Sequence, residues 1–167
     1  MSGAGAAAFR DGQVERLARF IREIGLRIEP ARLEAASFLP GVLVRDGAIL
    51  VDATRLAWPG DLLHEAGHLA VSPPEVRAAL PAVGDDPAEE MAALAWSYAA
   101  ACHLGVDPAL VFHPAGYKGG GDALRAAFEC GRGPGLPLLE WLGMTLGRKA
   151  AADAGQAPFP HMLRWLR

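Results

Sequence analysis

Hydrophobic residues near the start of the chain recur every three or four positions, and this spacing predicts an amphipathic helix over residues 11–25. Arg and Glu occupy most of the positions between them, and the apolar positions are Val14, Leu17, Phe20, Ile21 and Ile24. Asp11 is suited to cap this helix and Gly25 to end it. The residues before it are mostly small, so residues 1–10 are expected to form a flexible leader.

The next segments predict a short helix followed by a β-hairpin. A helix is expected over 30–38, because Pro30 can open a helix and the Pro40-Gly41 pair can stop one. Apolar residues then surround Asp46-Gly47 in the segment 42–52. Because Asp-Gly is typical of a tight hairpin turn, this segment predicts two antiparallel strands.

Two longer helices are predicted after the hairpin. The first begins at Asp61, which can cap it after the break at Trp58-Pro59-Gly60, and ends at Ser72-Pro73-Pro74. The second spans 87–104 behind the cap Asp86 and is apolar almost all round beyond its first turn, so a central position is expected. Shorter helices are predicted over 122–130, 138–146 and 159–167, after a glycine-rich loop at 116–121. These elements predict an α+β fold.

Composition limits the domain count and the partners. The chain has 167 residues, 51% of them hydrophobic, which suits one domain, and we assign that domain to 11–167. The formal net charge is -3 with acids and bases mixed, so no nucleic-acid partner is expected. Met1 to Ala8 lacks the features of a signal peptide, and the longest apolar run, 91–102, is too short to cross a bilayer. A cytoplasmic protein with no membrane association is therefore expected, with Cys102 and Cys130 as buried thiols.

The segment His64-Glu65-Ala66-Gly67-His68 indicates a metal site. Residues four apart on a helix share one face, so His64 and His68 can bind a single Zn²⁺ ion. Glu65 lies beside this pair, where a carboxylate can take a proton from a zinc-activated water and pass it to a leaving amine. The spacing predicts a zinc-dependent peptidase of zincin type, with a small sheet beside the metal-binding helix.

A third ligand must come from another part of the chain. Catalytic zinc normally has three protein ligands, and the long metzincin motif needs Gly and His where this chain has Val71 and Pro74. Glu90 is preferred because it shares the apolar stripe of the 87–104 helix, where a carboxylate is unfavourable unless it binds a cation or a partner. Glu89 is the alternative, and stabilisation by the helix dipole is a sufficient reason for acids at both positions. The full set of candidates is Glu75, Asp85, Asp86, Glu89, Glu90, His103 and His113.

The order of these motifs resembles the ImmA/IrrE-type zinc peptidases of bacteria. The resemblance covers roughly residues 42–105 and depends on His64-Glu65-Ala66-Gly67-His68 and on Glu90-Met91-Ala92-Ala93-Leu94-Ala95-Trp96. It implies a gluzincin-like site, in which His64, His68 and Glu90 bind zinc and Glu65 is the catalytic base.

A peptidase also needs a donor for the oxyanion and a surface for the peptide. Tyr117 and His113 are the first candidates for the donor, followed by His103 and Lys118. The peptide or protein substrate is expected to add to an exposed edge of the 42–52 hairpin as an extended strand. The alternatives to a peptidase are a metal-binding regulator without turnover and a helix-rich interaction domain without metal.

Overall fold

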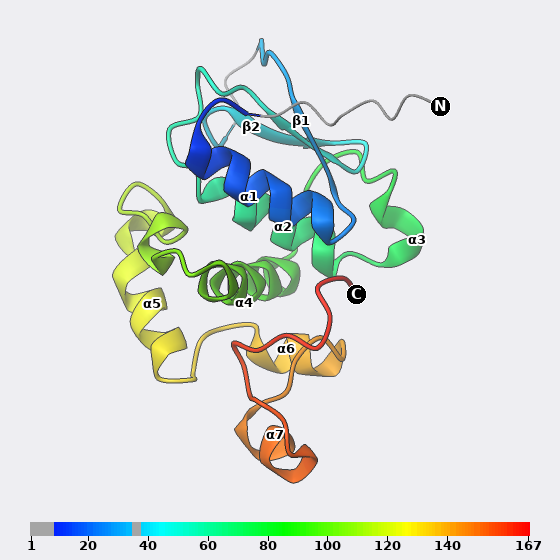
Figure 1. Ribbon diagram of the computed structural model, residues 1–167, viewed down its shortest axis with the longest axis vertical. Helices are drawn as coiled ribbons and strands as arrows, with labels where there is room; N and C mark the ends of the chain where they lie inside the picture. The colour runs from blue at the N-terminus through cyan, green and yellow to red at the C-terminus, as the bar shows by residue number, and fades with distance from the viewer. Residues whose placement is uncertain (1–8, 35–37) are drawn as a thin grey trace.

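A computed structural model describes residues 9–34 and 38–167, which form an α+β fold with seven α-helices and a three-stranded sheet (Figure 1). The elements in chain order are α1 Gly12–Glu23, β1 Arg27–Pro30, β2 Val42–Arg45, β3 Ala48–Val51, α2 Asp61–Val71, α3 Pro74–Arg77, α4 Pro87–Leu104, α5 Gly121–Glu129, α6 Leu136–Trp141 and α7 Arg148–Ala154. Two short 3₁₀ turns, η1 Pro108–Leu110 and η2 Tyr117–Gly119, lie between α4 and α5. No helix in the described ranges is both long enough and apolar enough to cross a membrane.

Helix α1 forms where the apolar spacing predicts it. The Asp11 side chain accepts hydrogen bonds from the backbone N–H groups of Gln13 and Val14, so the predicted cap is confirmed. Residues 1–8 of the expected leader lie outside the described residues. Phe9 is buried in the core, and its backbone N–H donates to Glu15 at 2.8 Å, so Phe9 is part of the folded domain.

The sheet has the strand order β1-β3-β2. The predicted hairpin is confirmed, because β2 and β3 pair antiparallel across a turn in which Asp46 and Gly47 both have positive φ, at 49° and 68°. The helix predicted over 30–38 is wrong for its described residues: Pro30 ends β1, residues 31–34 are irregular, and 35–37 are not described. Pairing of β1 with β3 in parallel, together with burial of Ile28, outweighs the local proline signal.

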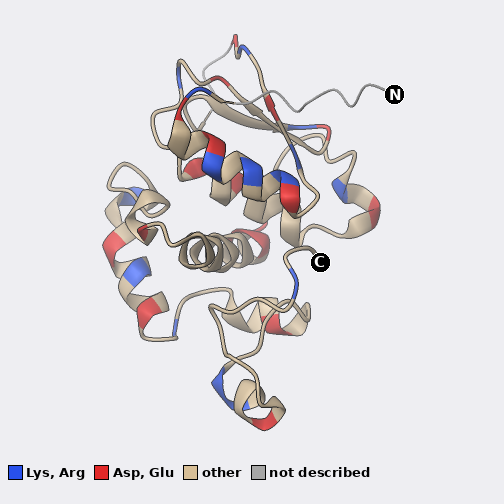
Figure 2. Cartoon of the chain, in the orientation of Figure 1, with Lys and Arg blue, Asp and Glu red and all other residues tan. Residues whose placement is uncertain are grey.

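The elements stack in layers, with the sheet on α1 and α2, then α4, then α6 (Figure 1). Figure 2 shows charges of both signs along α1, whereas α4 carries charge only in its first turn. Ten consecutive residues of α4, 92–101, are buried, which confirms its predicted central position. Its predicted boundaries are also confirmed, since Asp86 caps it and Gly105 ends it with φ of 62°.

The C-terminal part of the described chain departs most from the sequence predictions. The helix predicted over 159–167 is absent, and this segment instead bonds to the helices it crosses, through the Trp165 carbonyl and the Arg167 N–H. Tertiary hydrogen bonds replace helical ones there. Helix α6 begins earlier and ends earlier than predicted, and α3 and α7 were not predicted. The expected burial of both thiols is wrong, because Cys130 is exposed and Cys102 is only partly buried.

Candidate metal centre

Helix α2 positions the two histidines on one buried face. Its N-cap is Gly60, which makes no side-chain cap bond, and Asp61 is the first helical residue rather than the predicted cap. Every residue of α2 is buried, including His64, Glu65 and His68. With Asp61, four ionisable groups of this helix are buried, which is costly unless charges or hydrogen bonds compensate and makes the helix a candidate site.

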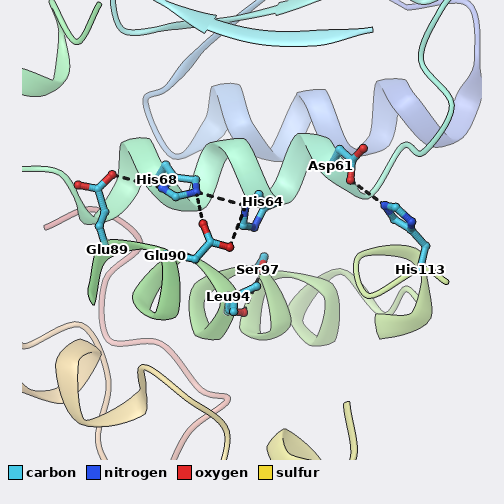
Figure 3. Close-up of polar contacts among 8 residues, drawn as sticks. All are labelled: Asp61, His64, His68, Glu89, Glu90, Leu94, Ser97 and His113. Atoms are coloured by element: carbon cyan, nitrogen blue, oxygen red, sulfur yellow. Dashed lines mark hydrogen bonds and ion pairs between the residues drawn. The ribbon is translucent and has the colours of Figure 1, made fainter. Parts of the chain in front are cut away.

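Close packing of α4 on α2 supplies the third group. A Cβ atom at Gly67 would lie 2.8 Å from the carbonyl oxygen of Ala93 and 3.1 Å from its Cα, so only glycine permits this approach. Glu90 lies nearly one turn before Ala93 on α4. The approach therefore places the carboxylate of Glu90 beneath the histidine pair (Figure 3).

The predicted ligands His64, His68 and Glu90 converge. Their ligand atoms lie within 4.8 Å of one another, so this group could hold a metal ion. Nε2 of His68 is 3.2 Å from Nε2 of His64 and 3.1 Å from Oε2 of Glu90, while Nε2 of His64 is 3.6 Å from Oε1 of Glu90. Two atoms bound tetrahedrally to one ion at about 2.0–2.1 Å lie about 3.3 Å apart. The observed separations are of this size, with the two histidines facing different oxygens of Glu90, so the group could hold one metal ion.

Glu89 contacts the other side of His68 and is not one of the converging ligands. Its Oε1 lies 3.2 Å from Nδ1 of His68 (Figure 3). A carboxylate there favours the tautomer with a proton on Nδ1, which leaves the Nε2 lone pair free for a metal. The two adjacent glutamates thus contact different atoms: Glu90 lies next to Nε2 of both histidines, and Glu89 lies next to Nδ1 of His68.

The ionisable groups of the cluster shift one another's pKa values. Burial alone lowers the pKa of His68, but the Glu90 hydrogen bond and the nearby carboxylates outweigh it and raise that pKa. The contacts with His64 and His68 hold the pKa of Glu90 well below its ordinary value. Burial raises the pKa of Glu65, which moves this carboxyl toward the range of a proton acceptor working near neutral pH.

A second buried pair lies at the N-terminal end of α2. Nε2 of His113 is 2.9 Å from Oδ1 of Asp61, and the indole of Trp58 stacks on the imidazole at 4.4 Å between ring centroids. The backbone reaches this position because Gly60 has no Cβ, which would otherwise lie 1.9 Å from the Leu110 carbonyl oxygen. The sequence predicts only a capping role for Asp61, and its position one turn before His64 is the one sequence signal that links it to the site.

Tyr117 lies between this pair and the metal centre. Its ring centroid is 6.0 Å from that of His64, with the planes nearly perpendicular, and 6.4 Å from that of His113. Burial, with the charges of Asp61, Glu90 and Glu65, raises the pKa of Tyr117, so its hydroxyl keeps its proton and can donate it in a hydrogen bond. His113 is a poorer candidate for the oxyanion donor than Tyr117, because its Nε2 is hydrogen-bonded to Asp61 and its Nδ1 is buried.

The remaining candidates lie elsewhere. His103 packs against the rings of Phe20 and Trp165, and Asp86 caps α4. Glu75 lies in α3, which has no buried residue, and neither it nor Asp85 belongs to the metal-binding group found among the described residues. An open cavity of about 290 Å³ lies away from the metal centre, and it is lined by Cys102, His103, Pro160, His161, Met162 and Trp165. None of the three converging residues lines this cavity.

Comparison with protein-family models, with curated proteins and with solved structures found no match to this chain.

Proposed function

We propose that this chain is a zinc-dependent peptidase of zincin type, related in its site to the ImmA/IrrE-type enzymes. The observation that carries the proposal is the convergence of His64, His68 and Glu90, whose ligand atoms lie within 4.8 Å of one another, with Glu65 buried beside them. The donor set of two imidazoles and one carboxylate suits zinc and leaves a fourth position for water.

The side chains divide the reaction between them. Zinc bound by the three ligands supplies Lewis acidity and lowers the pKa of a water molecule. Glu65 accepts a proton from the attacking water and returns it to the leaving amine, so peptide plus water gives a carboxylate and an amine. Tyr117 is the oxyanion donor in this proposal, because its hydroxyl stays protonated and its ring lies against His64.

The sheet offers a docking edge for an extended peptide. In the order β1-β3-β2, strand β3 is covered on both sides, and no described strand pairs with the outer edge of β2. A substrate strand adding to β2 gains backbone hydrogen bonds regardless of its sequence. Docking at β2 remains a prediction, and a peptide cross-linked within 42–45 tests it.

Metal content and one substitution test the proposal. Purified protein expressed with ample zinc should contain about one zinc ion per chain by elemental analysis. Glu65→Gln should keep the metal and lose cleavage of a broad peptide library, whereas the matched Glu75→Gln on α3 should keep both. Absence of zinc, or unchanged cleavage by Glu65→Gln, would contradict the proposal.

A metal-binding regulator without turnover is the second candidate. It is favoured by the position of Tyr117 against His64 and by the open cavity, whose lining includes none of the three proposed ligands. Zinc binding without cleavage of any library peptide by the wild-type protein would support it. A protein without metal is the third alternative, because a protonated His68 could bridge Glu89 and Glu90 by itself.

A further inference from the structure

The pair formed by Asp61 and His113 is buried at a depth that packing alone does not explain. Asp61 is 2% exposed and His113 is 4% exposed. Oδ2 of Asp61 and Nδ1 of His113 are buried without a hydrogen-bond partner in the described part of the chain. Apolar residues of similar volume often stabilise a protein as well as, or better than, such a buried pair. A polar pair retained there suggests a role beyond filling the core.

The loop after His113 has an unfavourable backbone conformation. Tyr117 and Lys118 have φ of 54° and 52°, and Gly119 follows with φ of 79°. Two successive side-chain-bearing residues in the left-handed region persist only where surrounding contacts hold them. The segment is therefore held under strain above α2.

The contacts that hold this loop begin at His113. A Cβ atom at Gly116 would lie 3.2–3.6 Å from three atoms of the His113 ring, and the Gly116 N–H donates to the His113 carbonyl at 3.1 Å. The next residue, Tyr117, then inserts its ring between those of Phe112 and His64, at centroid distances of 5.4 and 6.0 Å. The His113 ring thus packs against Gly116, the residue that leads into the turn at Tyr117.

We propose that Asp61 and His113 act as a positioning pair that holds the strained 116–119 turn, and so keeps the Tyr117 ring against His64. Trp58 stacks on the His113 ring and adds to this support. Asp61 acts from the same helix as the ligands, three residues before His64, so the pair couples the loop directly to the metal-binding helix (Figure 3). This inference rests on the proposed peptidase function for its catalytic meaning, but the position of Tyr117 can be measured without any activity.

Fluorine NMR on protein labelled with 3-fluorotyrosine tests this directly. The chain has two tyrosines, and Tyr98 stacks on Phe128 in the core at 4.8 Å, so it serves as an internal reference. Asp61→Ala is expected to shift or broaden the Tyr117 signal and leave the Tyr98 signal in place. Asp61→Asn should restore the wild-type signal, because its amide oxygen still accepts from Nε2 of His113. Asp122→Ala, at an exposed site that follows the loop, is the matched control and should change neither signal.

Activity gives the second readout. Tyr117→Phe and Asp61→Ala should each lower kcat about 100-fold with little change in KM, and the double variant should be no slower than either alone. Zinc content should remain about one per chain in all of them. Should Asp61→Ala fail to fold, His113→Leu removes the same hydrogen bond and should displace the Tyr117 signal alone.

The outcomes separate this inference from the peptidase proposal. An unchanged Tyr117 signal in both Asp61→Ala and His113→Leu, or equal displacement of both tyrosine signals, overturns the positioning pair, even if the protein cleaves peptides. A displaced Tyr117 signal in a protein that cleaves nothing supports the pair and contradicts the peptidase.

Discussion

Replacing Gly67 with alanine is expected to weaken the metal centre by separating the helices that form it. The new Cβ would lie 2.8 Å from the Ala93 carbonyl oxygen, and the two helices must move by several tenths of an ångström to restore an ordinary contact. Overpacking of a tight interface costs about 1–3 kcal/mol. Alanine regains about 1 kcal/mol of helix propensity, so a net destabilisation of about 0–2 kcal/mol is expected.

The matched control is Gly12→Ala at the start of α1, where an added Cβ meets nothing within 4 Å. This variant keeps the propensity gain without the clash, so the two variants should differ by about 2 kcal/mol, or roughly 4–8 °C in Tm. Thermal unfolding of the metal-free proteins measures this difference.

Zinc affinity is the more specific readout of the Gly67 variant. Because Glu90 is on α4 and the histidines are on α2, helix separation should reduce the affinity about tenfold in competition with a chelator, which corresponds to about 1.4 kcal/mol. Gly12→Ala should bind zinc as the wild type does. If Gly67→Ala matched Gly12→Ala in both stability and zinc affinity, the argument that close helix approach builds the site would be refuted.

Three further perturbations test separate contacts. Glu89→Gln should lower zinc affinity about 10–100-fold, because His68 loses the carboxylate at Nδ1, while a chelator competition with Glu75→Gln should show no change. Glu65→Gln should stabilise the metal-free protein at pH values above 4.5, the ordinary pKa of the carboxyl group. The folded wild type binds the Glu65 proton more tightly than the unfolded chain does, so its stability falls as the pH rises from 4.5 through the raised pKa of the folded state. Melting curves from acid to neutral pH should therefore coincide at low pH and diverge above it, and a constant gap would contradict this. Arg77→Met should lower the unfolding free energy by about 1–3 kcal/mol in a denaturant titration, because Arg77 donates to the carbonyls of Leu69 and Ser72 at the end of α2; full retention of stability would remove this role.

Caps, turns and helix boundaries were predicted correctly where they depend on residues close together in the sequence. The Asp11 cap, the Asp46-Gly47 turn and the proline and glycine boundaries of α4 all act within a few residues, and each is present. Strand β1 has only four residues and forms because β3 lies beside it, so its short pattern could not compete with the helix signal of Pro30. Helix α7 buries a single alanine, Ala151, and therefore has almost no apolar periodicity to detect.

In the candidate site, too, the residues related by local spacing were predictable and those joined by tertiary packing were not. His64 and His68 are related by helix geometry alone, and their shared face follows from a spacing of four. Glu90 was preferred for its place in an apolar stripe, but its side chain is 44% exposed and Met91 is exposed. The distinction from Glu89 depends instead on how α4 rotates against α2. The contact between Asp61 and His113 joins positions 52 residues apart and depends on the loop path past Gly60, which no spacing in the sequence reports.

The segment crossing both metal-site helices has a thermodynamic consequence. The Arg167 N–H donates to the Ala70 carbonyl at the end of α2, and the Trp165 carbonyl accepts from the Trp96 indole of α4. A ligand that draws α2 and α4 together also raises the free energy needed to open this segment, by linkage. The proposed metal binding therefore predicts slower amide hydrogen exchange at Arg167 when metal is added, in a backbone group outside the proposed ligand set.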